Sequence, residues 1–143
     1  NDWDTIESIK VKDLIVTKSQ VGKLIEDYNN NNIKLFSQKD NIEETFFPKR
    51  SPKDGKIDLS LGVRDTYNLI RGVTKPFPGA FLMCDDMKIT IWDAVPFDYK
   101  VGEIIKFVEG TSKFILKLVD GTLLVNDYEC EKDYHFREGL ILK

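Results

Sequence analysis

The sequence has few of the residues that most often carry chemistry. Its 143 residues include two cysteines and one histidine, without the CxxC or Cys/His spacing of a metal site. It contains no glycine-rich phosphate loop and no serine in a nucleophile elbow. No apolar run approaches the ~20 residues that cross a bilayer, and no basic segment leads into an apolar one as in a signal peptide. The sequence therefore predicts a cytoplasmic protein without a metal site, with reduced cysteines and no membrane role.

The charge and apolar content are those of an ordinary globular protein. Hydrophobic residues make up 41% of the chain and charged residues 31%, with a net charge of −3. This balance gives no global attraction for a phosphate backbone and weakens any nucleic-acid hypothesis. The length suffices for one compact core, or for one domain with an appendage, and we expect the second.

The first part of the chain is only partly patterned. Residues 1–16 fit no single period and predict short pieces of helix or strand. From Thr17 to Asn30 the spacing of Val21, Leu24, Ile25 and Tyr28 predicts a helix, capped by Thr17 or Ser19. The asparagines at 29–32 predict its end, because Asn tolerates left-handed conformations.

A punctuated and locally basic linker follows. Pro48, Pro52 and Asp54-Gly55 interrupt it. Phe46 and Phe47 stand just before Lys49 and Arg50, and aromatic faces beside cations are able to hold a nucleotide base and its phosphates. The alternative is that one ring fixes the linker to the domain while the basic side chains are merely solvated.

A second helix is predicted at about 63–74, with Ser60 or Asp58 as its cap. Arg71 lies near its C-terminus, where a cation interacts favourably with the helix dipole; contact with a ligand is the alternative for this residue. The helix must stop before Pro76, because a proline pushes the preceding residue out of the α region. Gly79 predicts a special conformation or a close backbone approach.

The remainder reads as short strands separated by turns. We expect strands at 80–84, 88–94, 103–108, 113–119 and 122–128, and hairpin turns at Asp85-Asp86, Gly110-Thr111 and Asp120-Gly121. Five such strands match the small barrel of the OB-fold. The fold class is therefore α+β: an N-terminal helix and linker followed by a small antiparallel OB-like β-barrel.

Two motifs in this order resemble the folate-dependent formyltransferases. The first runs from Thr45 to Asp58 (TFFPKRSPKDGKID), and the second comprises NLIR at 68–71, PFPGAF at 76–81 and KITIWDA at 88–94. The resemblance covers roughly residues 20–128. It implies a division into the end of a catalytic domain (1–44), a linker (45–62) and an OB-like C-terminal domain (63–143).

The resemblance implies that an Asn, a His and an Asp on the family's catalytic domain perform formyl transfer. It also implies that this domain binds 10-formyltetrahydrofolate. The only histidine here, His135, has no Asn two residues before it and no proline-containing loop after it. We therefore assign no catalytic residue to this chain and expect the segment alone to be inactive.

The acceptor implied by the resemblance is either an amino-sugar nucleotide or methionyl-tRNA. Residues 76–143 contain more acids than bases, which favours the sugar nucleotide. We expect Phe46, Phe47, Lys49, Arg50 and Arg71 to border the acceptor, since pockets often form at domain junctions. The expected partners are the acceptor, the catalytic domain of the same polypeptide and a possible second copy of the chain. The alternative is a stand-alone OB-like binding or dimerisation module, with Trp92, Phe97, Tyr99 and Phe107 as candidate stacking rings.

Overall fold

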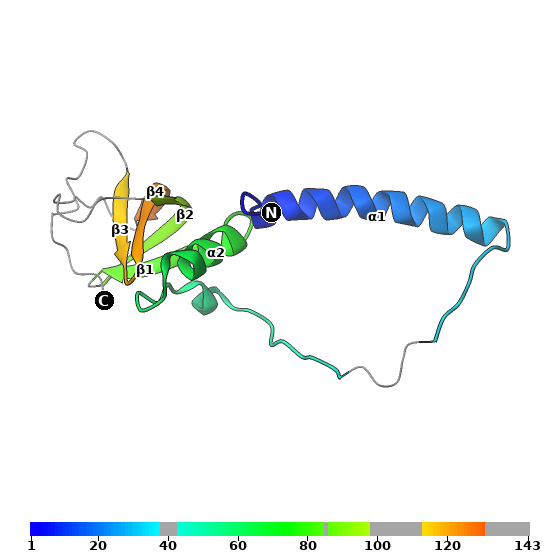
Figure 1. Cartoon of the computed structure of the whole chain (residues 1–143), viewed down its shortest axis with the longest axis horizontal. Helices are drawn as coiled ribbons and strands as arrows, with labels where there is room; N and C mark the ends of the chain where they lie inside the picture. The colour runs from blue at the N-terminus through cyan, green and yellow to red at the C-terminus, as the bar shows by residue number, and fades with distance from the viewer. Residues whose placement is uncertain (38–42, 85, 98–112, 131–143) are drawn as a thin grey trace.

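A computed structural model describes residues 1–37, 43–84, 86–97 and 113–130. A long helix, α1 (Ile6–Asn29), projects from an α+β body (Figure 1). The body contains the short 3-10 helix η1 (Pro52–Gly55), helix α2 (Val63–Val73) and a curled antiparallel sheet. The predicted fold class, a helix and linker followed by an α+β body, is confirmed.

Helix α1 begins much earlier than the sequence pattern predicts. Its N-cap is Thr5, whose side chain accepts from the Ser8 backbone N–H while the Ser8 hydroxyl accepts from the Thr5 N–H. The predicted caps Thr17 and Ser19 are wrong, because both lie inside the helix. The helix buries none of its residues. A helix that buries one face carries apolar residues at a helical period, and because α1 buries no face, the sequence at its start shows no such period.

The end of α1 agrees with prediction. The helix ends at Asn29, Asn30 is its C-cap, and Asn31 adopts a left-handed conformation with φ of 55°. Asparagine adopts this conformation more readily than most residues do. The asparagine tract therefore terminates the helix.

Helix α2 packs its apolar side on the sheet. Its residues Thr66, Tyr67 and Ile70 are buried, and it ends before Pro76 as predicted. The predicted caps Ser60 and Asp58 are wrong: the N-cap is Gly62, and the carboxylate of Asp120 accepts the Val63 N–H at 2.7 Å. Asp58 instead accepts from the backbone and hydroxyl of Ser60.

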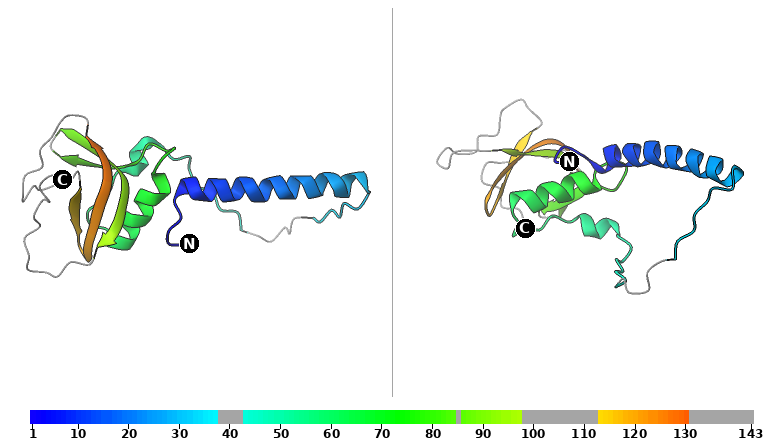
Figure 2. Two further views of the ribbon diagram at one scale, coloured as in Figure 1. Left: turned by 90° about the horizontal axis from the view of Figure 1, so that it is seen from above. Right: turned by 45° about the vertical axis from the view of Figure 1, so that its right-hand side comes forward.

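The sheet contains β1 (Ala80–Cys84), β2 (Met87–Phe97), β3 (Phe114–Leu118) and β4 (Gly121–Cys130), in the order β1-β2-β4-β3. The register of β1 with β2 pairs Cys84 with Met87, as the predicted hairpin requires, and that of β3 with β4 pairs Leu118 with Gly121, so the second turn lies at 119–120 rather than at Asp120-Gly121. The predicted strand at 103–108, the turn at Gly110-Thr111 and most of the C-terminal tail lie outside the described residues. The described strands curl to form half of the expected barrel (Figure 2).

One face of this sheet and α2 enclose the core. Alternate residues are buried along β1, β2 and β3, because successive side chains of a strand point to opposite faces. Thus Ile89 and Ile91 are buried, whereas Thr90 and Trp92 lie on the other face. The largest fully buried apolar side chains are Ile70, Leu82, Ile89, Ile91, Leu123, Val125 and Cys84.

Candidate functional site

The C-terminal end of the linker is anchored at the edge of β1. The Ile57 N–H donates to the Phe81 carbonyl at 2.8 Å, and Lys56 forms a bridge to the same strand. Gly55 approaches the backbone of Gly79 so closely that a Cβ on Gly55 would lie 2.5 Å from the Gly79 carbonyl oxygen. The linker therefore enters the α+β body at a fixed point.

A second local structure fixes the chain directly after Arg50. The Asp54 carboxylate accepts the Ser51 N–H at 2.5 Å and its hydroxyl at 3.1 Å, which closes the start of η1. These two hydrogen bonds, with a smaller contribution from the charge of Arg50, hold the pKa of Asp54 below its ordinary value. The basic pair thus lies immediately before an ordered turn.

The four predicted linker residues lie together along this exposed stretch. Phe46 is 85% exposed and Phe47 88% exposed, and Lys49 and Arg50 are also exposed. The expectation that one ring could fix the linker to the domain is not met by the described contacts, since both rings face solvent. Two rings and two cations are available to a ligand on this segment.

The fifth predicted residue, Arg71, lies elsewhere. Its Nη1 donates to the carbonyl oxygens of Asn1 at 2.8 Å and Asp4 at 3.0 Å, and its Nε donates to Asn68 Oδ1 at 3.0 Å. The guanidinium carbon also lies 5.3 Å from the centre of the Tyr67 ring. The structure therefore joins Arg71 to the segment before α1 and not to the linker residues.

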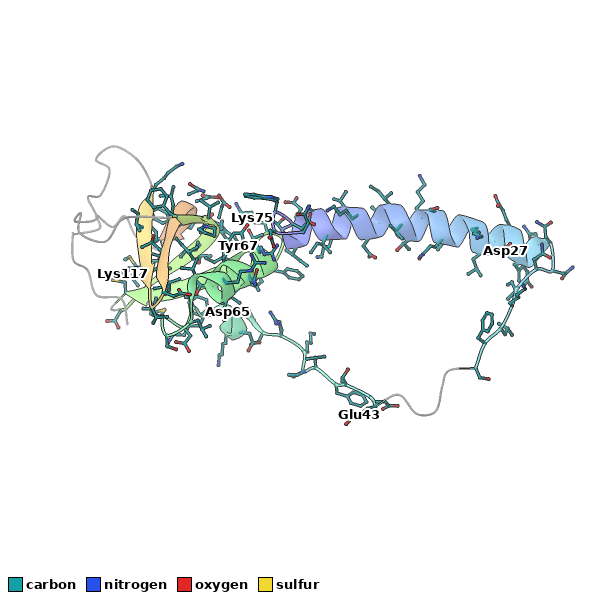
Figure 3. The ribbon with its side chains drawn as sticks, in the orientation of Figure 1. Asp27, Glu43, Asp65, Tyr67, Lys75 and Lys117 are labelled. Carbon is teal, nitrogen blue, oxygen red and sulfur yellow. The ribbon has the colours of Figure 1, made fainter. Side chains whose placement is uncertain are left out.

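Two neighbours of Arg71 on α2 were not identified from the sequence. Arg64 Nη2 lies 2.6 Å from Asp2 Oδ1, and the Tyr67 hydroxyl donates to the Asp2 carbonyl at 2.9 Å. In Figure 3 Tyr67 lies where α2 meets the start of α1, far from Asp27 at the other end of that helix. The spacing of residues 64, 67 and 71 places them on one face of a helix, which is a signal present in the sequence.

The outer face of β1 and β2 carries paired rings and cations. Lys75 Nζ lies 4.9 Å from the centre of the Trp92 ring, and Lys88 Nζ 4.7 Å from that of Phe81. A register shift in β2 begins after Ile91, so Trp92 lies at a bulge. Its ring packs against Gly79, and its buried Nε1 has no hydrogen-bond partner among the described residues.

The described residues contain no cluster of three or more His, Cys, Asp or Glu side chains able to hold a metal. Cys84 is buried and Cys130 half-buried, and both are free thiols. Burial raises the pKa of Cys130, with a smaller contribution from the nearby Cys84. His135 lies outside the described residues.

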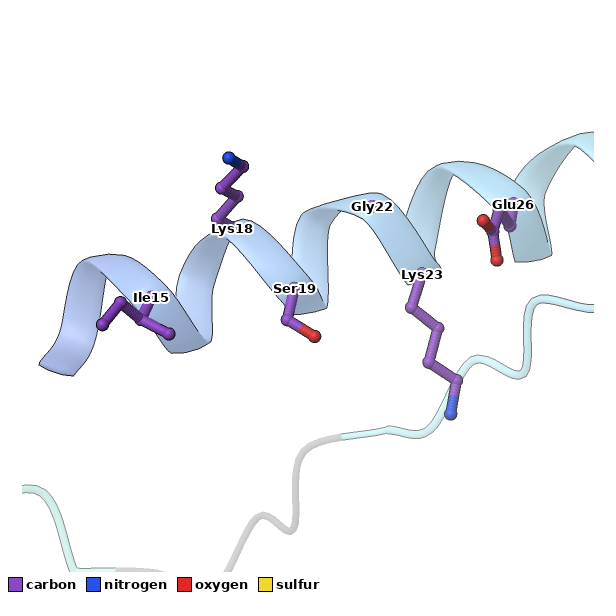
Figure 4. A pocket seen from close by; sticks show the side chains of 6 residues that line it. All are labelled: Ile15, Lys18, Ser19, Gly22, Lys23 and Glu26. Carbon is purple, nitrogen blue, oxygen red and sulfur yellow. The ribbon is translucent and has the colours of Figure 1, made fainter.

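A shallow hollow on α1 is lined by Ile15, Lys18, Ser19, Gly22, Lys23 and Glu26. All six belong to the same exposed helix, and Gly22, which has no side chain, lies among them (Figure 4). The hollow has no opposing wall and offers no enclosed binding site.

Within the described ranges, no helix is long and apolar enough to cross a bilayer.

Comparison with known proteins identifies the family of the α+β body. Residues 49–135 match the family described as formyl transferase, C-terminal domain. A 66-residue segment is 48% identical to the bifunctional polymyxin resistance protein ArnA of Wigglesworthia glossinidia brevipalpis, covering 44% of this chain and 10% of that protein. The chain thus corresponds to a small part of this relative.

A similar fold occurs in the crystal structure of a HypX variant from Aquifex aeolicus. The TM-score is 0.57 at 17% sequence identity, and the match covers 78% of this chain and 20% of that one. At this identity the likeness concerns the fold alone. The family match extends over more than half of the sequence and includes α2 and the four strands. The chain belongs to the formyl transferase C-terminal domain family.

Proposed function

We propose that this chain is the acceptor-positioning part of a 10-formyltetrahydrofolate-dependent formyltransferase. The observation that carries the proposal is the family match over residues 49–135. Formyl transfer needs a group that takes the proton of the amine and donors for the oxyanion. The described residues present neither in a recognisable arrangement, and we assign the catalytic Asn, His and Asp, together with the folate site, to a separate catalytic domain of the same polypeptide. The segment alone is inactive.

The exposed helix α1 supports this division of labour. Its apolar side chains Val11, Leu14, Val21, Ile25 and Tyr28 are between 48% and 70% exposed. Large exposed apolar surfaces of this kind usually belong to an interface. We assign α1 to the end of the catalytic domain (1–44), the following residues to a linker (45–62), and the rest to the C-terminal domain (63–143).

We further propose that the acceptor is an amino-sugar nucleotide and that it binds beside the linker. Phe46 and Phe47 present exposed rings, and Lys49 and Arg50 present cations directly before the ordered turn of η1. Such a pairing suits a nucleotide base and its diphosphate. The acidic excess of residues 76–143 disfavours a tRNA, whose binding depends on neutralised phosphates. Methionyl-tRNA is therefore the second candidate.

The acceptor kinetics of the complete enzyme test the proposed site. The double variant Lys49→Ala, Arg50→Ala should raise the acceptor KM about tenfold, equal to about 1.4 kcal/mol of binding. The double variant Lys53→Ala, Lys56→Ala removes the same charge from neighbouring positions and should leave the acceptor KM unchanged. The KM for formyl-folate should stay constant in both. Equal acceptor kinetics in the parent enzyme and both double variants would contradict the proposed acceptor site.

The mass of the native gene product tests the catalytic assignment separately. This chain has a mass of 16.5 kDa, and one further domain adds about 15 to 25 kDa. A native product of only 16.5 kDa would contradict the catalytic assignment and indicate a stand-alone binding or dimerisation module. A stand-alone stacking module has weaker support, because the Trp92 ring already packs on Gly79 and Lys75 lies over it.

A further inference from the structure

The polar side of α2 holds the segment that leads into α1. We call this contact the joint: it comprises Arg64, Tyr67 and Arg71 of α2 together with residues 1–4. Three of its hydrogen bonds end on backbone carbonyls, two from Arg71 and one from the Tyr67 hydroxyl. A fourth contact is the ion pair of Arg64 with the Asp2 carboxylate. The contacts to carbonyl oxygens fix the path of the backbone whatever its side chains are.

Two contacts within α2 hold the side chain of Arg71 in place. Its Nε is engaged by Asn68 Oδ1 one helical turn earlier, and its guanidinium lies over the ring of Tyr67, which is 8% exposed. A planar guanidinium with several donors is able to bridge two carbonyl oxygens, which a lysine ammonium does less well. The Nη1 group of Arg71 does this between the carbonyls of Asn1 and Asp4.

The joint lies directly before the first turn of α1. Thr5 follows Asp4 and caps the helix, and the Asp4 carboxylate binds Ser8 and Lys12 within the helix. The backbone held by Arg71 is therefore continuous with the helix start. Beyond it, Lys10 of α1 lies over the Phe77 ring at 4.3 Å, and α1 also approaches α2. Since α1 buries no residue, these few contacts set its direction.

We propose that the joint sets the direction of α1 relative to the sheet, and that Arg71 is a positioning residue. The inference concerns contacts within this chain. It does not rest on the proposed formyltransferase function, and it is tested on the chain itself.

Distance measurements between two spin labels test the joint. The labels are attached at Asp27→Cys on the far end of α1 and at Lys117→Cys on β3, both labelled in Figure 3. The background carries Cys84→Ala and Cys130→Ser, so that only the introduced thiols react. The intact joint should give one narrow distance distribution. Arg71→Ala with Tyr67→Phe should at least double its width while the sheet unfolds at a nearly unchanged temperature.

The matched control is Arg50→Ala, which removes the same charge from an exposed position outside the joint and should keep the narrow distribution. If the double variant fails to fold, Tyr67→Phe alone decides the matter, because it keeps the ring and removes only the hydroxyl that binds the Asp2 carbonyl. A folded joint variant with the same width as the parent and the Arg50 control would overturn the proposal.

Discussion

Gly79 stands at a point where the fold has no room for a side chain. Its φ is +85°, a conformation that residues with a Cβ seldom adopt. A Cβ built on it would lie 2.5 Å from Thr90 Cγ2 and 2.8 Å from Cζ3 of Trp92. We therefore expect Gly79→Ala to destabilise the α+β body strongly.

The magnitude follows from two contributions. The left-handed backbone costs an alanine about 1 to 2 kcal/mol relative to glycine. Forcing a methyl group against the side chains of β2 costs a further 1 to 3 kcal/mol or so, as overpacked cores do. The sum is about 2 to 5 kcal/mol in the free energy of unfolding, which corresponds to a fall in melting temperature of roughly 10 °C or more for a domain of this size.

Chemical and thermal denaturation followed by circular dichroism measure this loss. The matched control is Gly72→Ala in α2, where the added Cβ has no neighbour within 4 Å. There the same substitution, in the last turn of α2, should raise the stability by up to about 1 kcal/mol, because alanine favours a helix more than glycine does. The pair should thus change stability in opposite directions.

A second variant separates the two contributions. Thr90→Ser removes the Cγ2 methyl that Gly79→Ala would meet first. Combined with Gly79→Ala it should recover about 1 kcal/mol, whereas the backbone cost should remain. A loss below about 1 kcal/mol for Gly79→Ala, or equal losses at Gly72 and Gly79, would refute the steric reasoning.

Three further changes test other parts of the fold. Ile70→Ala should lower the free energy of unfolding by about 2 to 5 kcal/mol, because it empties a site 1% exposed between α2 and the sheet; urea denaturation measures this. Asp120→Ala should cost about 1 kcal/mol by the same assay, because the Val63 N–H loses its acceptor. Hydrogen bonds from Lys12 and then Ser8 hold the pKa of Asp4 below its ordinary value. The ionised carboxylate of Asp4 therefore stabilises the folded chain fully at a pH above that ordinary value, and this stabilisation is lost as the pH falls through the lowered pKa. Helicity measured during an acid titration should therefore fall over this range, and Asp4→Asn should remove that part of the change.

The sequence predicted the elements whose causes are local. The alternation of Ile89 and Ile91 with Thr90 and Trp92 located β2 and its buried face. The proline after Lys75 and the asparagines after Tyr28 located two helix ends. In each case the neighbouring residues alone impose the conformation, so a short window of sequence contains the information.

Features created by distant segments could not be predicted in this way. The first N–H of α2 is accepted by Asp120, on the turn between β3 and β4, whereas the local pattern indicates nearby candidates such as Ser60. The start of α1 was missed because the helix has no buried face to impose a period. The partners of Arg71 lie near the N-terminus. That Phe46, Phe47, Lys49 and Arg50 form a binding site remains a prediction.

The projection of α1 has a mechanical consequence. At 1.5 Å per residue, its 24 residues form a rod about 36 Å long. A tilt of about 10° at the base would carry the tip about 6 Å, as the arc of a 36 Å lever requires. Whatever is attached along α1 is therefore aimed from its base, by a few hydrogen bonds to backbone oxygens.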